Sequence, residues 1–172
     1  FSIDKDVFMQ NYDLVIANDH GGFDLKLKIL DFLSQAGYKI YSNNSEKRHL
    51  NVGQKNHKTI LDLGCDSLER VDYPDYAKKL VEEIIEGNAK YGILICNTGI
   101  GMSIAANRSS VIRAALCLDE FMAERARSHN DANVLVLASK LTEEKTVFQM
   151  IDKFLNTEFE SGRHAQRVNK IS

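Results

Sequence analysis

The sequence contains no apolar run long enough to cross a bilayer. Its longest apolar stretches, such as residues 93–96 and 134–138, have only a few residues each, whereas a spanning helix needs about 20. No signal-peptide pattern is visible either. Together these absences exclude a membrane role and predict a cytoplasmic protein, while a leader ahead of Phe1 stays an open question.

The sequence also has no excess of basic residues and only three cysteines. The 22 lysines and arginines are outnumbered by 24 aspartates and glutamates, for a formal charge of −2, so no overall positive field exists to attract nucleic acid. Any bound anion must be held by a local cluster of side chains. Cys65, Cys96 and Cys117 are odd in number and lack CxxC spacing, which argues against a disulfide scaffold and for a reducing compartment.

Several familiar ligand motifs are missing as well. The glycine-rich segment 96–103 has no lysine after its last glycine, unlike a Walker A loop, and Ile104 takes the place of the third glycine of a dinucleotide fingerprint. The cysteines lack metal-ligand spacing, and no carboxylate–histidine cluster is evident. His49 and His57 lie eight residues apart in a polar segment, which favours exposed histidines over ligands. We therefore expect neither a metal nor a cofactor.

Short apolar, β-branched runs do alternate with segments of helical period. This alternation is typical of a parallel sheet covered by helices. The sequence predicts one doubly wound α/β domain over residues 1–172, Rossmann-like or flavodoxin-like, with a parallel five-stranded sheet and helices on both faces. The expected strands are 14–18, 38–41, 92–96, 111–116 and 134–138. The expected helices are 23–35, 75–86, 102–107, 119–128 and 142–155.

The ends of the expected helices carry recognisable signals. Gly37 and Gly87 suit the position just after a helix, and Thr142, ahead of Glu144, suits an N-cap with an acidic first turn. Two segments break the alternation. Residues 42–58 are polar without a usable period and are interpreted as a surface insertion, and residues 159–172 form a C-terminal tail with clustered basic side chains.

Polar residues flank three of the expected strands. Residues 18–22 (NDHGG) follow the first strand, residues 96–103 follow the third, and residues 129–131 (HND) lead into the fifth. Ligands of open α/β sheets bind at the carboxyl ends of the strands, so we expect these groups to meet at one edge. Singly, each has a structural reading, since Asp19 can cap a helix and His20 and His129 can be loop histidines.

The loop after the third strand is the most informative segment. Two glycines let its backbone approach a ligand and aim N–H groups at it, and the following helix adds a positive partial charge. Cys96 is therefore expected to be biased toward its thiolate, because helix N-termini lower cysteine pKa values. A tight turn with a buried core cysteine is the alternative.

Five segments in order resemble the ribose-5-phosphate isomerase type B family, which also includes galactose-6-phosphate and allose-6-phosphate isomerases. They cover nearly all of residues 13–172 apart from the insertion. The segments are NDHGG at 18–22, VDYPDYA at 71–77, ILICNTGIGMSIAAN at 93–107, SHNDANV at 128–134 and GRHAQRV at 162–168.

The resemblance implies interconversion of ribose 5-phosphate and ribulose 5-phosphate in the pentose phosphate pathway, through an enediolate and without metal or organic cofactor. It implies that Cys96 is the base, because Met102 stands where other members have a glutamate. Thr98 and the backbone N–H groups of residues 97–101 correspond to the group that stabilises the enediolate. His129 corresponds to the residue that opens the sugar ring.

The resemblance also implies a substrate-binding set and a partner. The family forms its site between two subunits, so we expect a homodimer, or a dimer of dimers, in which some residues serve the neighbour's site. His164 is a further candidate for the phosphate clamp. The implied substrate-binding residues are Asp19, His20, Tyr73, Asn97, Gly99, Gly101, Asn130, Lys140, Arg163 and Arg167.

Three features of the sequence depart from the family pattern, and alternative substrates and functions also stay open. Asn97 replaces a usual glycine, although asparagine tolerates a left-handed backbone. Lys140 replaces a common arginine and loses its bidentate geometry. The insertion has no counterpart in typical members. A six-carbon sugar phosphate is an alternative substrate, and a non-catalytic phosphosugar-binding domain or a nucleotide-binding module of flavodoxin type are alternative functions.

Overall fold

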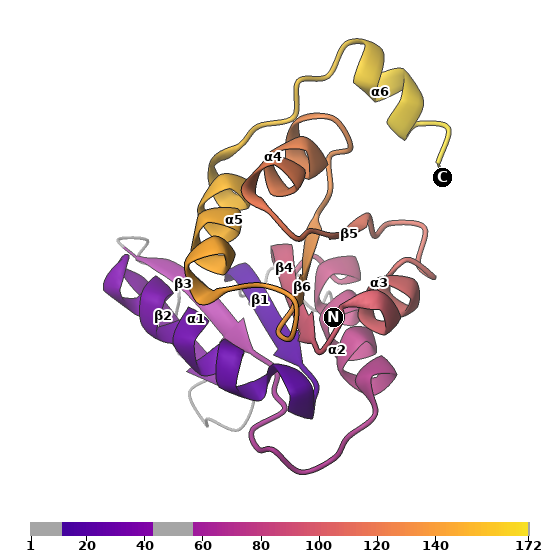
Figure 1. Cartoon of the computed structure of the whole chain (residues 1–172). Helices are drawn as coiled ribbons and strands as arrows, with labels where there is room; N and C mark the ends of the chain where they lie inside the picture. The colour runs from indigo at the N-terminus through magenta and orange to yellow at the C-terminus, as the bar shows by residue number, and fades with distance from the viewer. Residues whose placement is uncertain (1–11, 43–56, 172) are drawn as a thin grey trace, which may run out of the picture.

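The described residues form a single six-stranded sheet with helices on both faces (Figure 1). The computed structural model describes residues 12–42 and 57–171. Neighbouring strands pair in parallel in the order β2-β3-β1-β4-β6-β5. This confirms the predicted α/β class with one strand more than expected. The strands are β1 (Tyr12–Asn18), β2 (Tyr38–Ser42), β3 (Lys58–Asp62), β4 (Ala89–Cys96), β5 (Ala114–Leu116) and β6 (Val134–Ala138).

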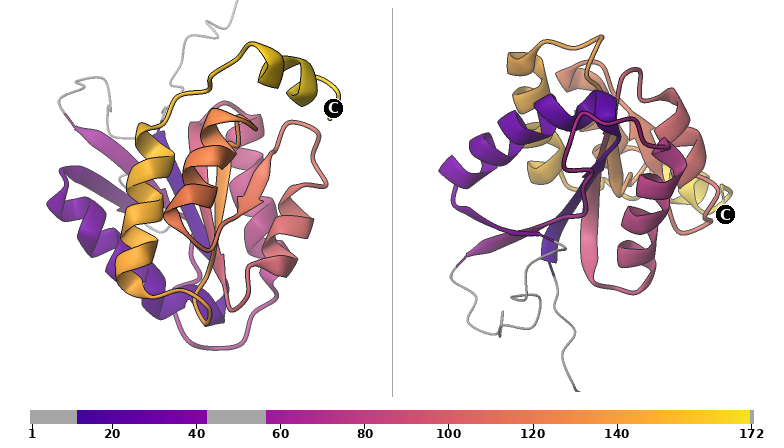
Figure 2. Two further views of the ribbon diagram at one scale, coloured as in Figure 1. Left: turned by 45° about the horizontal axis from the view of Figure 1, so that its top comes forward. Right: turned by 90° about the horizontal axis from the view of Figure 1, so that it is seen from below.

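Two helical layers cover the sheet, and each has its own apolar core. One core joins the sheet to α1, α4 and α5, and the other joins it to α2 and α3 (Figure 2). A short 3-10 turn, η1 (His20–Gly22), precedes α1. The helices are α1 (Phe23–Gln35), α2 (Tyr73–Ile85), α3 (Ile100–Ala106), α4 (Glu120–Ser128), α5 (Glu144–Asn156) and α6 (Arg163–Val168).

The central strand β4 shows why the sheet is buried on both faces. Ile93 and Ile95 belong to the core under α1, α4 and α5, whereas Leu94 and Cys96 belong to the core under α2 and α3. Successive side chains of a strand point to opposite faces, and a parallel sheet between two helical layers needs apolar residues on both. This alternation directs the Cys96 side chain toward α2 and α3.

The strand that the sequence did not predict is β3. It begins at Lys58, the last residue of the polar segment interpreted as an insertion, and only its last four residues are buried, so its apolar run is very short. Most of that insertion, including His49, lies outside the described residues, whereas His57 is described and exposed. The strand expected at 111–116 is also shorter than predicted, because only Ala114–Leu116 pairs with β6.

The predicted helix ends are mostly confirmed. α1 has the expected bounds, and Gly37 (φ 95°) and Gly87 (φ 78°) have the positive φ of residues that end helices. The predicted N-cap of α5 is wrong. Glu143 occupies that position without a side-chain cap bond, and the Thr142 hydroxyl is buried with no hydrogen-bond partner among the described residues.

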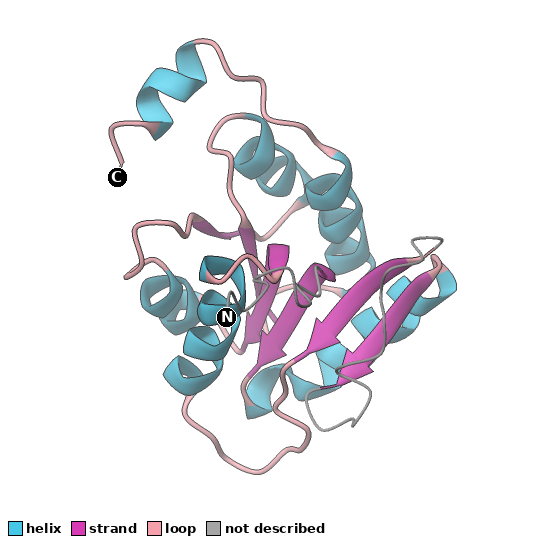
Figure 3. Cartoon of the chain, turned by 180° about the vertical axis from the view of Figure 1, so that it is seen from behind, coloured by secondary structure: helices cyan, strands magenta, loops and turns pink. Residues whose placement is uncertain are grey.

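The last helix, α6, follows an extended segment after α5 and lies beyond α4, at the periphery of the fold (Figures 1 and 3). Arg163 and Arg167 lie four residues apart within this helix. Within the described residues, no helix combines the length and the apolar character needed to cross a membrane.

Candidate active site

The predicted site residues separate into two groups at opposite edges of the sheet. We call the end where the strands finish the carboxyl edge and the end where they begin the amino edge. The carboxyl-edge group follows β1, β4 and β6 or begins α2, and consists of Asp19, His20, Tyr73, Cys96, Asn97, Thr98, Gly99, Gly101 and Lys140. The amino-edge group consists of His129, Asn130, Arg163 and Arg167.

The expectation that residues 129–131 join the carboxyl edge is wrong. In the parallel pairing of β4 with β6, Gly92 lies opposite Val134 and Cys96 lies opposite Ala138. His129 comes five residues before Val134, so it lies beyond the starts of these strands. Glu160, just before α6, donates its N–H to the Ser128 carbonyl at 3.0 Å. The tail and the end of α4 therefore share the amino edge, away from Cys96.

Cys96 is the last residue of β4, and it is buried with 6% of its surface exposed. The Gly99 N–H donates to its Sγ at 3.0 Å. Burial nevertheless raises the pKa of the Cys96 thiol above its usual value, although hydrogen bonds from the Gly99, Met102 and Thr98 backbone lower it. The expected bias toward the thiolate is therefore wrong for the protein without substrate, because desolvation outweighs the N–H groups.

The loop after Cys96 depends on two glycines. Gly99 has φ 74°, a left-handed conformation that glycine adopts at little cost. A Cβ atom on Gly101 would lie 2.5 Å from the Tyr73 ring, so this glycine allows Tyr73 to pack over the start of α3. The Thr98 side chain accepts the Ile100 N–H at 3.4 Å. The loop thus places Thr98 beside the Cys96 thiol, and Tyr73 of α2 packs against its second glycine.

Backbone hydrogen bonds attach the loop to the segment after β6. The Cys96 carbonyl accepts the Ser139 N–H at 2.9 Å, and the Asn97 carbonyl accepts the Lys140 N–H at 3.0 Å. The Ser139 hydroxyl donates to the Gly21 carbonyl at 2.7 Å, which joins the segments after β1, β4 and β6. Ser139 was missed by sequence reasoning, since a lone serine after a strand carries no signal.

Asp19 and His20 lie at the end of β1, next to the loop. The buried Asp19 carboxylate accepts the Gly22 N–H at 3.2 Å, as the helix-capping interpretation predicted, and burial raises its pKa. His20 Nδ1 accepts the Val71 N–H at 3.2 Å, which leaves the proton on Nε2. A hollow of about 400 Å³ adjoins these side chains. It is lined by Asp19, His20, Arg70, Val71, Asp72, Tyr73, Pro74 and Asp75.

A buried lysine in α1 supports the carboxyl edge of the sheet. Lys26 in α1 is 1% exposed, and its Nζ donates to Asp62 Oδ1 at 3.2 Å and to the Cys65 carbonyl at 2.6 Å. Asp62 also accepts the Gly64 N–H at 2.9 Å. The ion pair therefore fixes the turn after β3 against α1. Sequence reasoning missed it because a lysine in an amphipathic helix is expected on the solvent side.

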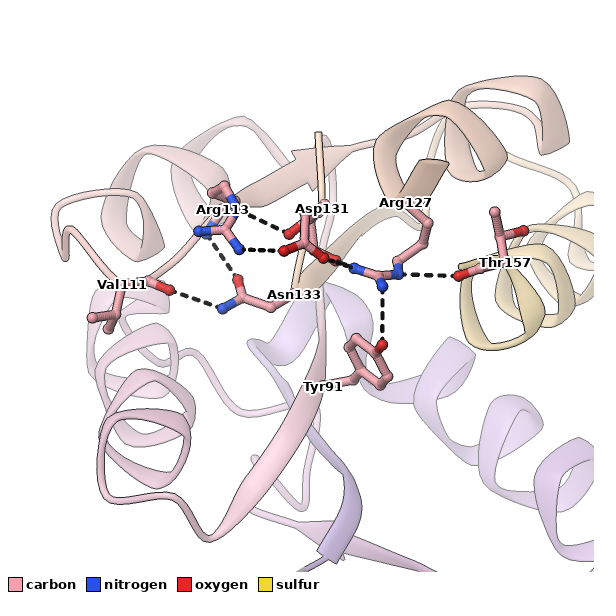
Figure 4. Close-up of polar contacts among 8 residues, drawn as sticks. Tyr91, Val111, Arg113, Arg127, Asp131, Asn133 and Thr157 are labelled. Carbon is pink, nitrogen blue, oxygen red and sulfur yellow. Dashed lines mark hydrogen bonds and ion pairs between the residues drawn. The ribbon is translucent and has the colours of Figure 1, made fainter. Parts of the chain in front are cut away.

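At the amino edge, an arginine network holds the segment that carries His129 and Asn130 (Figure 4). Asp131 has φ 47°, in the left-handed region, and its carboxylate accepts from Arg113 at 3.1 Å and from Arg127 at 2.9 Å. Arg127 is 4% exposed and also donates to the Tyr91 hydroxyl at 3.0 Å. These bonds stabilise a backbone conformation that is uncommon for residues other than glycine, although aspartate adopts it more readily than most.

His129 ends α4 and lies against a second histidine. Its ring stacks on His164 of α6 with centroids 4.0 Å apart, and its Nε2 is 3.4 Å from Arg125 Nη1. Glu160 Oε2 lies 3.8 Å from His129 Nε2 and 3.4 Å from His164 Nε2. This carboxylate–histidine cluster contradicts the expectation that the chain has none. Arg163 and Arg167 are exposed nearby on α6.

Comparisons with known proteins agree with this architecture. A ribose 5-phosphate isomerase RpiB structure from Thermotoga maritima is 46% identical, with a TM-score of 0.79 over 92% of this chain and 95% of that one. Ribose-5-phosphate isomerase B of Escherichia coli is 36% identical over 90% of each chain. A Rickettsia conorii protein, named provisionally as a sugar phosphate isomerase, is 51% identical over 95% of this chain and 99% of its own length.

The family match covers most of the chain, although less of it than the pairwise matches do. Residues 42–171 match the family described as Ribose/Galactose Isomerase. The match includes Cys96 and its glycine loop, as well as the His129 segment and the tail. Several of the solved structures that resemble the fold are type B ribose 5-phosphate isomerases. With the parallel sheet, the buried thiol beside a glycine loop and the basic tail all in place, the chain belongs to the ribose-5-phosphate isomerase type B family of sugar phosphate isomerases.

Proposed function

We propose that this protein interconverts ribose 5-phosphate and ribulose 5-phosphate in the cytoplasm, with Cys96 as the base. The observation that carries the proposal is the Cys96 thiol at the carboxyl edge, 3.0 Å from the Gly99 N–H at the head of α3. Met102, which is fully buried in the core, has no group that can accept a proton. Cys96 is therefore the base that this loop offers.

In this mechanism the Cys96 thiolate removes the proton from C2 of the open-chain aldose. The electron pair moves through C1 to the carbonyl oxygen, which gives an enediolate. A proton then passes from the C2 hydroxyl to the C1 oxygen, and the Cys96 thiol returns the abstracted proton to C1, which produces the ketose with its carbonyl at C2. Backbone N–H groups at the start of α3, with the Thr98 hydroxyl, stabilise the developing oxyanion. Because burial raises the pKa of Cys96, only a minor fraction of the enzyme molecules carry Cys96 as the thiolate at neutral pH.

The substrate is held by both groups of residues, which requires two subunits. Asp19, Tyr73 and Asn97 contact the sugar from the carboxyl edge, and His20 and Lys140 reach its phosphate. The remaining ring-opening and phosphate-binding functions lie at the amino edge of the same chain, and therefore serve a neighbour's site. These amino-edge residues are His129, Asn130, Arg163 and Arg167.

A homodimer also accounts for exposed apolar side chains around the short edge strand β5. Ile104 of α3, Val111 before β5, and Leu118 and Phe121 at the start of α4 are each at least 43% exposed. Exposed apolar residues beside an outermost strand that no other strand covers are typical of a contact surface. We therefore assign the contact with the second copy of the chain to this surface.

The proposal is tested by turnover of three substrates and by complementation. We expect ribose 5-phosphate to have a higher kcat/KM than allose 6-phosphate and galactose 6-phosphate, and the reverse order would assign a six-carbon substrate. Arg167→Ala and Cys96→Ala should each inactivate the enzyme, while their co-expression should restore activity in mixed dimers. Mixed dimers that form but stay inactive would contradict the shared site.

A further inference from the structure

We propose that His129, Glu160 and His164 form a binding site for a zinc-type divalent metal ion, and that the bound metal inhibits the enzyme by occupying His129. The binding part rests on the geometry of the amino edge alone. The inhibition part rests on the proposed function, in which His129 opens the sugar ring.

The three side chains already lie close to a metal-binding arrangement. Their ligand atoms all lie within 4.8 Å of one another, and the carboxylate oxygen is 3.8 Å and 3.4 Å from the two Nε2 atoms. Zinc binds nitrogen and oxygen at about 2.0–2.2 Å in a tetrahedron, which places ligand atoms roughly 3.4 Å apart. The Glu160–His164 separation meets this requirement. The His129 ring is stacked almost parallel to His164, at 14° between planes, so it must rotate about its side-chain bonds to direct its in-plane Nε2 lone pair at the same ion.

The backbone under the cluster is fixed, whereas two of its side chains can adjust. His164 is buried and four residues after Glu160 in the tail, and the Glu160 N–H is bonded to the Ser128 carbonyl, next to His129. The side chains of His129 and Glu160 are 34% and 53% exposed. Solvent therefore reaches the site, and a water molecule can complete the coordination.

The choice of ligands favours a transition metal over magnesium or calcium. Two imidazoles with one carboxylate suit zinc, copper and nickel, whereas magnesium and calcium prefer oxygen ligands alone. The competing charge is Arg125, whose Nη1 lies 3.4 Å from His129 Nε2. The same Nη1 lies 3.8 Å from Glu124 Oε1, so a small rotation toward Glu124 frees the imidazole. The exposed Arg163 and Arg167 also oppose a cation, which limits the affinity.

Direct binding is measured with Co²⁺ absorption spectra and Zn²⁺ calorimetry on the full-length protein. We expect d–d bands of a four-coordinate Co²⁺ site with nitrogen and oxygen ligands. Glu160→Gln should weaken binding by at least roughly 10–100-fold, since loss of even an outer partner of a metal ligand typically costs that much, and Arg125→Gln should tighten it. A sulfur-to-cobalt charge-transfer band, or unchanged binding in Glu160→Gln, would assign the metal to the cysteines or to another surface and overturn the proposal.

Inhibition is measured as turnover with Zn²⁺ relative to each variant's own rate in EDTA. We expect Zn²⁺ to inhibit, EDTA to restore the rate, and the inhibition constant to rise in Glu160→Gln and fall in Arg125→Gln in parallel with binding. Zn²⁺ that binds through Glu160 without inhibiting would contradict the role of His129 in the inhibition. If the protein does not isomerise ribose 5-phosphate, the binding measurements still decide the metal site.

Discussion

The two edges of the sheet are built in different ways. At the carboxyl edge, the Cys96 thiol, the Gly99 N–H and the carbonyls that accept from Ser139 and Lys140 belong to one tightly connected backbone turn. At the amino edge, the chain path depends on long side chains, with Arg113 and Arg127 converging on Asp131. A site held by backbone hydrogen bonds tolerates almost no change of shape. A site held by long side chains can adjust, but the fold loses stability when one partner of an ion pair is removed.

The largest expected effect concerns the thiol itself. Cys96→Ala should lower kcat by about 10²–10⁴-fold, the usual cost of losing a general base, while binding of ribose 5-phosphate stays close to that of the unchanged enzyme. Steady-state kinetics and calorimetry measure the two quantities. Cys117→Ala is the control, because this cysteine is equally buried but belongs to the core under α1, α4 and α5. Normal turnover by Cys96→Ala would exclude the cysteine mechanism.

The next effect concerns the shape of the loop. Gly99→Ala forces a side chain into a left-handed conformation and against Leu116 and Val136, which displaces the N–H bonded to Cys96. A displacement of about 1 Å can cost roughly 10²-fold in rate, and we expect a loss of kcat of that size. Gly37→Ala is the matched control, since Gly37 also has a positive φ but no neighbour near its Cβ position. Equal kinetic losses in the two variants would refute a specific role for the Gly99 turn.

The pH dependence of turnover should follow the raised pKa of Cys96. Burial favours the neutral thiol, so the reactive thiolate increases as pH rises toward that pKa. We expect kcat/KM for ribose 5-phosphate to increase by up to about tenfold per unit between about pH 7 and 9. The residual rate of Cys96→Ala should lack this increase. A rate that is already constant from neutral pH upward would indicate that the thiol is ionised in the working enzyme.

The smallest effect on turnover is expected from the arginine network under the amino-edge residues. Arg127→Ala removes a buried cation that bonds Asp131 and Tyr91. Breaking such a buried pair costs about 3 kcal/mol or more, which corresponds to a fall in Tm of roughly 6–12 °C for a chain of this size. Arg125→Ala is the control, because its exposed ion pair should contribute less than about 1 kcal/mol. Thermal unfolding followed by circular dichroism distinguishes the two, and equal Tm values would show that the network is not stabilising.

Local sequence patterns predicted what local physics determines. The alternation of apolar residues predicted the α/β class and the bounds of α1. Turn chemistry predicted the glycines that follow helices, Gly37 and Gly87. The strand β3 was missed because its short apolar run follows a polar segment. The direction of the Cys96 pKa was predicted wrongly, because the helix N-terminus can be recognised in the sequence but the depth of burial cannot.

The candidate site also combines features that local sequence motifs predict with features that depend on the folded chain. The sequence motifs gathered the candidate residues, but their separation to opposite edges depends on the parallel register of β4 and β6. The contacts of Asp131 with Arg113 and Arg127 join residues that are 18 and 4 positions apart, and the first of these has no local signal. The cluster of His129, Glu160 and His164 likewise exists only once the tail returns to the end of α4.

The buried ion pair of Lys26 with Asp62 has a consequence for how the protein can change over time. The two residues are 36 positions apart, and replacing either one alone leaves the other as an uncompensated charge, at a cost of about 3–5 kcal/mol. Replacing both with apolar residues of similar volume leaves no uncompensated charge and therefore costs less, although the Cys65 carbonyl and the Gly64 N–H lose their side-chain partners. Substitutions at these two positions are therefore expected to occur together during divergence, so that Lys26 and Asp62 covary among relatives.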